Sequence, residues 1–309
     1  MTTPLTAQVA VVAGATRGAG RAIAVELARA GAFVYATGRS SSEHGRSELD
    51  RPETIEETGE LMAAAGEGAA VRVDHTDPDA VAELVGRVEA DHGRLDILVN
   101  DMFGGDRYAE WDKPLWEHDL TGGWRMMEMG VHSHLITAAV SIPLLLKRSA
   151  GDPGGLIVEM TDGTHAYNAS FRTGVGFYYD LVKANVERIT IGLAAELKEH
   201  PVTAVAVTPG WMRSEQMLEG FGVTEQDWRP ACDHEPSFAV SESPTYVARG
   251  VAALAADHTG VAGDAGTILT ARQLADRYQL TDVDGSRPDC WGWMAASTKG
   301  KQAAINDFR

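Results

Sequence analysis

Two side chains four residues apart, Tyr179 and Lys183, form a pattern that can carry acid–base chemistry. Residues four apart in an α-helix lie on the same face, so we expect the phenol and the ammonium group side by side. A free phenol has a pKa of about 10 and is a poor proton donor or base near neutral pH. A neighbouring positive charge lowers the pKa of a phenol, so Tyr179 is predicted to act as general acid or base assisted by Lys183.

A glycine-rich turn near the amino terminus, Gly14-x-x-x-Gly18-x-Gly20, provides a second pattern. It follows the apolar run 8–13 and precedes a helical pattern, which is the order found in nucleotide-binding folds. Glycines in such a turn let backbone N–H groups approach a pyrophosphate closely, although they also occur for packing alone. We predict that the cofactor contacts the loop residues Gly14, Thr16, Arg17, Gly18, Ala19 and Gly20.

The end of the second apolar run favours NADP over NAD as the cofactor. Where an NAD enzyme carries Asp or Glu for the ribose 2′-hydroxyl, this sequence has Gly38 followed by Arg39. A guanidinium suits the 2′-phosphate of NADP, and Arg17 can reach the same phosphate from the glycine loop. The alternative is that both arginines are ordinary surface residues.

Short apolar runs alternate with helical patterns along most of the chain, and these elements position the motifs. The runs predict about seven strands, at 8–13, 33–37, 70–73, 95–99, 156–160, 203–207 and 267–270. Helices are predicted over 18–30, before 66, from 78 onward, and over 131–148, 178–200 and 246–256. The alternation indicates a doubly wound parallel sheet of the Rossmann type, a three-layer αβα fold whose ligand crevice lies at the carboxyl ends of the strands.

Length and composition fit one globular domain over residues 1–309. Hydrophobic residues make up 44% of the chain, and the formal net charge is −17, which argues against binding nucleic acid. Two cysteines, Cys232 and Cys290, cannot form a disulfide framework, and no C-x-x-C pair suggests a metal. Because no apolar run is long enough to cross a bilayer and no signal peptide is present, we expect a cytoplasmic protein with no membrane partner.

These motifs resemble those of the classical short-chain dehydrogenase/reductase family over roughly residues 8–270. The glycine pattern, Tyr179 with Lys183, and Pro209-Gly210 after the sixth predicted strand match motifs of that family. The resemblance implies a Rossmann-type fold, hydride transfer between NAD(P) and a carbonyl or alcohol, and a homodimer or homotetramer. It also implies cofactor contacts for Asp74, His75, Asn100, Lys183, Pro209 and Gly210.

The serine that binds the substrate carbonyl in this family is missing. Aligning GGLIVEMTDG with the family segment places Thr161 and Asp162 at two serine positions, with Asp162 at the catalytic one. An ionised carboxylate only accepts hydrogen bonds and would repel a developing oxyanion. Asp162 can therefore serve if it stays protonated, or if the substrate presents a donor such as an amine, a hydroxyl or a protonated imine. Alternatively Thr161 or Thr164 supplies the hydroxyl, or Asp162 only caps the turn.

A second departure lies in the helical pattern before the fifth predicted strand. The asparagine that holds a relay water for the lysine in the family corresponds to Gly130 in this sequence. His132 and His134 lie nearby, where they can relay protons or simply be packed or solvated.

Insertions follow three of the predicted strands, at 101–129, 161–177 and 212–243, and a further segment, 281–309, ends the chain. They carry large apolar side chains such as Trp111, Phe171 and Trp211, so we expect a fairly large apolar or aromatic substrate. The acidic insertion 212–243 is predicted to be a mobile lid, and the C-terminal segment to pack over the site or a partner subunit.

The sequence is consistent with three functions. The leading one is an NADP-dependent oxidoreductase that acts on a carbonyl, an alcohol or an imine. The others are a non-redox dehydratase, isomerase or cyclase that uses Asp162 and Tyr179 as acid and base, and a cofactor-binding regulator without chemistry. The intact Tyr179–Lys183 pair argues against the regulator.

Overall fold

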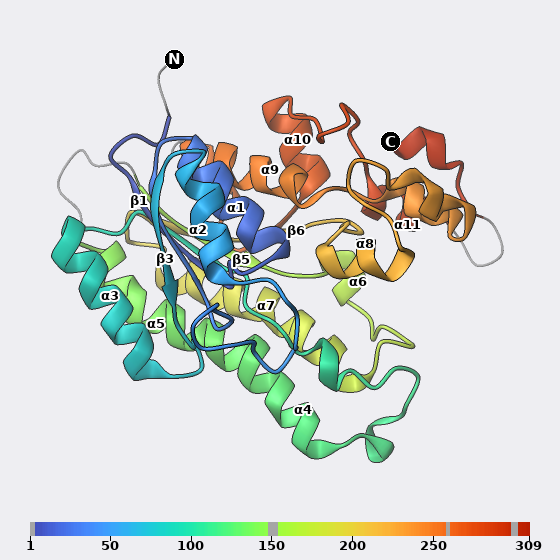
Figure 1. Ribbon diagram of the computed structural model, residues 1–309, viewed down its shortest axis with the longest axis horizontal. Helices are drawn as coiled ribbons and strands as arrows, with labels where there is room; N and C mark the ends of the chain where they lie inside the picture. Colours follow the sequence, from blue (N-terminus) through green and yellow to red (C-terminus); the bar gives the residue numbers. More distant parts are fainter. Residues whose placement is uncertain (1–3, 148–153, 258–259, 298–301) are drawn as a thin grey trace.

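A seven-stranded parallel sheet runs through the centre of the molecule in the order β3-β2-β1-β4-β5-β6-β7 (Figure 1). The structure, a computed structural model, describes residues 4–147, 154–257, 260–297 and 302–309. The strands are β1 (Val9–Ala13), β2 (Phe33–Gly38), β3 (Glu67–Arg72), β4 (Ile97–Asn100), β5 (Gly155–Met160), β6 (Val202–Thr208) and β7 (Ile268–Thr270). The predicted doubly wound sheet is confirmed, and the strand order reverses between β1 and β4, where ligands bind in this architecture.

Helices cover both faces of the sheet, which completes the predicted αβα layering (Figure 1). One face carries α1 (Gly18–Arg29), α2 (Ile55–Ala63), α9 (Pro244–Ala256) and α10 (Ala271–Tyr278), and the other carries α3 (Pro78–His92), α5 (Ser133–Leu145) and α7 (Phe177–Glu196). The insertions and the C-terminal segment contribute α4 (Leu120–Met127), α6 (His165–Asn168), α8 (Glu215–Phe221) and α11 (Cys290–Ala296). The end of the helix predicted over 131–148, and residues 298–301 of the C-terminal segment, lie outside the described residues. Every helix in the described ranges is too short or too polar to span a lipid bilayer.

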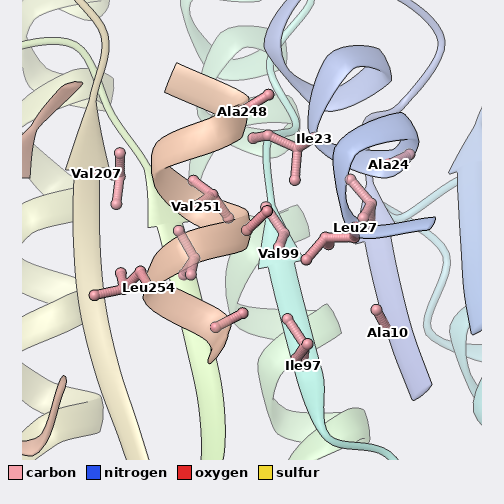
Figure 2. Packing of buried hydrophobic residues seen from close by; sticks show 14 of the residues in the cluster. Ala10, Ile23, Ala24, Leu27, Ile97, Val99, Val207, Ala248, Val251 and Leu254 are labelled. Atoms are coloured by element: carbon pink, nitrogen blue, oxygen red, sulfur yellow. The ribbon is translucent and has the colours of Figure 1, made fainter. Parts of the chain in front are cut away.

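The two faces of the sheet are packed with aliphatic side chains. Figure 2 shows Ile23 and Leu27 of α1 and Val251 of α9 around Val99 of β4, and all four are fully buried. Burying a side chain of this size contributes about 1.5–3 kcal/mol, so the packing of α1 on α9 holds the glycine loop at the end of β1. A separate buried cluster fills the opposite face under α3 and α5.

The insertion 212–243, predicted to be a mobile lid, is a packed segment in this structure, and its mobility stays a prediction. Its helix α8 and two short 3₁₀ turns surround a small apolar cluster that includes Trp228 and Phe238. The Arg213 guanidinium, which is fully buried, lies 2.9 Å from Asp282 Oδ2 of the C-terminal segment and 2.8 Å from Glu225 Oε1. Breaking a buried ion pair leaves an uncompensated charge and is costly, so these contacts fix the insertion against the rest of the molecule.

Candidate active site

The glycine loop joins β1 to α1 and lines a cavity of about 250 Å³. Gly14 has φ +89, and a Cβ on this residue would overlap the Asp101 carbonyl at the end of β4, so only glycine fits. Most predicted cofactor residues line this one cavity, namely Gly14, Thr16, Arg17, Gly18, Ala19, Arg39, Asp74 and His75. The cavity therefore brings the glycine loop and the second predicted phosphate-binding corner together.

A carboxylate already lies at the start of α1. The Gly18 N–H donates to both oxygens of Glu215, at 3.2 and 3.0 Å, and Glu215 is the first residue of α8. A helix amino terminus favours negative charge because its N–H groups and the helix dipole point toward the ligand. The contact marks the turn as a place that accepts an anion. Sequence reasoning counted Glu215 only among the acidic residues of the insertion.

Arg17 and Arg39 both line the cavity, and each is paired with a carboxylate. Arg17 Nε donates to Glu53 at 3.0 Å, while its buried Nη2 has no hydrogen-bond partner within the described ranges. Arg39 Nη1 lies 2.7 Å from Glu48 Oε1. Glu48 also pairs with Arg125, whose hydrogen bond, together with those from Tyr108 and Arg39, lowers the pKa of Glu48 to about 2 against the effect of burial. The two carboxylates fix the direction of the guanidinium groups and were missed at the sequence level, because both lie in the loop after β2 without a motif.

Asp74 and His75 follow β3 and both line the cavity, but their side chains have different partners and different charges. Burial opposes the charge of Asp74, but hydrogen bonds from Thr76 outweigh burial and lower the pKa of the Asp74 carboxyl. The His75 ring instead lies between Thr37 Oγ1, at 2.7 Å, and Thr137 Oγ1, at 2.8 Å. Burial lowers the pKa of His75 to about 3, so the ring is neutral and holds β2 against α5.

Tyr179 and Lys183 share one face of α7, as their spacing predicts. Lys183 Nζ lies 5.6 Å from the centroid of the Tyr179 ring and 3.7 Å from that of Phe103. The Tyr179 ring is edge-on to Phe103 at 5.5 Å and contacts Trp111 at 5.3 Å, measured between ring centroids. Phe103 also lines the cavity formed by the glycine loop, so it connects the tyrosine–lysine pair with that loop.

The expected lowering of the Tyr179 pKa by Lys183 is wrong for this structure. Burial first, and then the Asp162 carboxylate, raise the pKa of Tyr179 well above its usual value. The Tyr179 hydroxyl donates to Asp162 Oδ2 at 3.4 Å, whereas the Lys183 ammonium lies over the Phe103 ring. The phenol is therefore held in its protonated form.

Asp162 is held by Arg172, a residue that sequence reasoning missed. Arg172 Nη1 donates to the backbone oxygen of Asp162 at 3.1 Å and to its Oδ2 at 3.2 Å. Arg172 Nε donates to Asp180 Oδ1 at 2.8 Å, and the Arg172 side chain is only 3% exposed. One signal was available, because Arg172 is the only Lys or Arg between 161 and 177, and a carboxylate at a catalytic position needs a counter-charge.

The two threonines considered as substitutes for the serine are engaged elsewhere. The Thr161 hydroxyl donates to the Lys183 backbone oxygen at 3.0 Å, and the Thr161 side chain is buried. Thr164 caps α6 by accepting from the Tyr167 N–H. Of the three candidates, only Asp162 contacts Tyr179.

A fully buried polar chain lies beneath the site. Asn100 Nδ2 donates to Glu159 Oε1 at 2.7 Å, and His134 Nδ1 lies 2.6 Å from Glu159 Oε2. His134 Nε2 lies 2.9 Å from the Met102 backbone oxygen. Burial disfavours a charged ring, but the Glu159 carboxylate outweighs it and raises the pKa of His134. Asn100 and His134 thus support the loop after β4, and both of their side chains face Glu159.

The C-terminal segment packs against the turn after β6, which carries Pro209 and Gly210. Trp291 Nε1 donates to the Pro209 backbone oxygen at 2.8 Å, and the Trp291 ring lies 5.1 Å from that of Tyr167. Gly210 is equally covered, since a Cβ there would lie 2.6 Å from Cys290 Cβ. Within the described ranges, no three His, Cys, Asp or Glu side chains gather as a metal site would need.

Fold and site together define a class, a Rossmann-type protein with a tyrosine–lysine pair near a glycine-rich turn at the end of the first strand. A family model described as short chain dehydrogenase matches residues 8–222. The chain therefore belongs to the short-chain dehydrogenase family, whose members are oxidoreductases that use nicotinamide cofactors.

Individual relatives agree with this assignment. The chain is 31% identical over 296 residues to dehydrogenase/reductase SDR family member 1 of Mus musculus, covering 92% of this chain and 86% of the relative. It is 27% identical over 295 residues to a hydroxynaphthalene reductase of Aspergillus fumigatus, covering 94% of each. The crystal structure of a dehydrogenase/reductase from Sinorhizobium meliloti superposes with a TM-score of 0.65 at 25% identity, covering 87% of this chain and 95% of that one.

Proposed function

We propose that the chain is an NADP-dependent oxidoreductase that transfers a hydride between the nicotinamide and a carbonyl, alcohol or imine of a fairly large apolar substrate. The observation that carries the proposal is the position of Tyr179 and Lys183 on one face of α7. Phe103 contacts both side chains and also lines the cavity formed by the glycine loop. A proton donor and a nucleotide site are thereby adjacent, which hydride transfer coupled to proton transfer requires.

The side chains around the cavity fit a dinucleotide phosphate. The Glu215 carboxylate on the Gly18 N–H is an internal stand-in for a phosphate, and Arg17 Nη2 is a buried donor without a partner in the described ranges. We assign Arg17 and Arg39 to the 2′-phosphate of NADP, with Glu53 and Glu48 holding the two guanidinium groups in place.

In this proposal, Tyr179, Lys183 and Asp162 each have a separate role in the reduction. When bound, the nicotinamide supplies the hydride to the carbonyl carbon. Tyr179 gives its hydroxyl proton to the carbonyl oxygen, and Lys183 holds a positive charge beside it. Asp162, held by Arg172, accepts a hydrogen bond from a donor group of the substrate near the reacting carbon.

Exposed aromatic side chains near Tyr179 support an aromatic or otherwise apolar substrate. Trp111, whose ring contacts that of Tyr179, is 52% exposed, and Phe171 in the insertion after β5 is 54% exposed. Apolar walls with a few placed polar groups are typical of ligand sites. The relative from Aspergillus fumigatus is named as a hydroxynaphthalene reductase, which fits the same kind of substrate.

The proposal is tested by following the oxidation of NADPH and of NADH at their nicotinamide absorbance, with a panel of bicyclic aromatic ketones such as 1-tetralone. We expect turnover with NADPH and a kcat/KM at least tenfold lower with NADH, because a guanidinium pair with a phosphate is worth about 1.5–3 kcal/mol. Arg39→Ala should remove most of the preference. Equal use of both cofactors would overturn the assignment to NADP, and no oxidation with any carbonyl, alcohol or imine would overturn the redox function.

The contact between Tyr179 and Asp162 favours a second candidate, a non-redox dehydratase, isomerase or cyclase. A protonated phenol 3.4 Å from a carboxylate is an acid beside a base, and this pair needs no hydride. Product formed from a hydroxylated bicyclic substrate with bound cofactor, and with no change in nicotinamide absorbance, would favour this function. A regulator without chemistry would show cofactor binding and neither reaction.

We also propose that residues 1–309 form one domain that assembles into a homodimer or homotetramer, as the family resemblance implies. Trp116, in the turn before α4, is 85% exposed, and Trp124, in α4, is 62% exposed. Apolar surface of this kind is typical of a subunit interface. Light scattering coupled to gel filtration would measure the assembly, with Trp116→Glu/Trp124→Glu expected to weaken it.

A further inference from the structure

The Lys183 ammonium group is held by an aromatic ring. Its Nζ lies 3.7 Å from the centroid of the Phe103 ring, and it makes no hydrogen bond or ion pair to any residue that the structure describes. A cation this close to a ring face is attracted by the negative charge of the ring quadrupole, most strongly where water is excluded. We propose that Phe103 is a positioning residue that places the Lys183 ammonium beside Tyr179. This inference rests on the proposed role of the tyrosine–lysine pair.

The Phe103 ring occupies a slot between two glycines. A Cβ on Gly130, in the π-helical turn Glu128–His132, would lie 3.1 Å from Phe103 Cδ2 and would overlap Val182 Cγ1. A Cβ on Gly105 would lie 2.9 Å from Phe103 Cζ. The Gly105 distance is shorter than real Cβ contacts, and the Gly130 distance is tighter than most of them, so the ring packs closely against the backbone on two sides. The absence of a side chain at Gly130 thus leaves room for both Val182 and the Phe103 ring.

The loop that carries Phe103 is fixed from below. The Met102 backbone oxygen, next to Phe103, lies 2.9 Å from His134 Nε2, and His134 is paired with the buried Glu159. The ring is also edge-on to Tyr179. Phe103 thus touches both members of the pair from a rigid base, and this contact fixes where the ammonium charge lies relative to the phenol.

A packing role and a charge role of Phe103 predict different results. Phe103→Leu fills much of the slot but has no ring face, and pentafluorophenylalanine at position 103 keeps the ring shape while reversing the charge of its face. If the ring holds the cation, both variants lower kcat for NADPH-dependent ketone reduction about tenfold, with the KM of the ketone changed less than twofold. Phe33→Leu, at the start of β2 and away from the site, has no cation contact among the described residues and should leave kcat within twofold.

A second measurement needs no turnover. The chain has six lysines, so isotope labelling of lysine side chains gives few signals, and Lys183→Arg identifies the one that belongs to Lys183. We expect its methylene protons next to Nζ to be shifted upfield by the ring current of Phe103 and to return to the common position in Phe103→Leu. Circular dichroism melting checks that both position-103 variants are folded.

The outcomes separate the two proposals. An upfield Lys183 signal together with a loss of kcat in both variants supports the positioning role. A Lys183 signal at the common position overturns the contact, and a shifted signal with unchanged kcat in the variants overturns its role. If wild-type protein shows no turnover while the signal is shifted, the proposed oxidoreductase function fails, the Phe103 contact stands, and the positioning role falls with that function.

Discussion

The two sides of the crevice are held in place by different means. On the cofactor side the backbone sets the positions, because the turn after β1 approaches Asp101 so closely that only Gly14 fits. On the catalytic side charged side chains set the positions, with Arg172 joining Asp162 to Asp180 and His134 paired with Glu159 beneath the loop after β4.

This contrast between backbone geometry and charged side chains explains which motifs of the family the chain keeps and which it changes. A turn defined by backbone geometry leaves few residue choices, and here the glycine pattern is intact. A site built from side chains can be rebuilt if a second change accompanies the first. At the position that we align with the family's serine, Asp162 is accompanied by Arg172, and at the position that we align with its asparagine, Gly130 lies beside Val182 and Phe103.

The largest expected effect is that of Tyr179→Phe, which should nearly abolish catalysis but leave cofactor binding unchanged. Tyr179→Phe removes the proton donor, so we expect turnover with NADPH to fall by a factor of about 100 to 10,000. The Kd of NADPH should stay within twofold, because the glycine loop does not contact this hydroxyl. Steady-state kinetics and a fluorescence titration of NADPH measure the two quantities. A variant that keeps wild-type turnover would show that Tyr179 is not the acid.

Removal of the Arg172 guanidinium tests whether charge holds the catalytic side together. In Arg172→Met, the Asp162 and Asp180 carboxylates lose their counter-charge, and we expect the free energy of unfolding to fall by about 2–4 kcal/mol. The estimate lies toward the low end for a broken buried pair because Asp162 is 41% exposed. Urea denaturation at pH 7 measures the change.

A double variant is the matched control for Arg172. In Asp162→Ser/Arg172→Met, the Asp162 carboxylate that lost its guanidinium partner is removed as well. The double variant should therefore recover part of the stability that Arg172→Met loses. If the effects of Asp162→Ser and Arg172→Met simply add, Arg172 and Asp162 are not coupled, and this ion pair does not hold the catalytic side.

Much of the fold follows from local patterns in the sequence. All seven strands and the principal helices lie where apolar runs and helical spacing predict them, because each buried element carries its own periodicity. The third strand shows the limit of this reasoning. The apolar run predicts it over 70–73 and it is found at Glu67–Arg72, since an edge strand that begins Glu-Gly-Ala-Ala has almost no apolar signal.

The candidate site was predictable only where a motif is local. The spacing of Tyr179 and Lys183 is by itself enough to place both side chains on one helix face. The contacts of Glu215 with Gly18, and of Phe103 with Lys183, join segments that are far apart in the chain. No periodicity or turn signal encodes such pairs, because the topology of the sheet brings them together.

Two buried histidines extend the comparison to the pH dependence of stability. Burial lowers the pKa of His75, on the cofactor side, to about 3, against about 6.5 when unfolded. The unfolded chain then binds more protons, so the free energy of unfolding should fall on acidification by about 1.4 kcal/mol per pH unit between these values. For His134 the folded pKa is raised by Glu159, so its contribution is complete below about pH 6.5 and is lost as the pH rises through the folded value.

Single variants test whether His75 and His134 cause these changes of the free energy of unfolding with pH. Urea denaturation between pH 4 and 9 should show that His75→Gln reduces the acid-side loss and His134→Gln reduces the alkaline-side loss, each relative to wild type. The same slope in wild type and variant would mean that the histidine is not the titrating group.

The smallest expected effect concerns a charge that intrudes on the cofactor side. Glu215 binds the Gly18 N–H where we place the pyrophosphate, so a phosphate must displace a carboxylate from the start of α1. Glu215→Gln removes this competition, and an interaction of about 0.3–1 kcal/mol at a helix end predicts a Kd of NADPH about two- to fivefold lower. The gain should shrink as salt is added, because salt screens exposed charges. Glu83→Gln makes the same change in net charge on α3, across the sheet, and should leave the Kd unchanged. If both variants tighten binding equally, net charge is responsible, and the cofactor side is defined by its backbone alone.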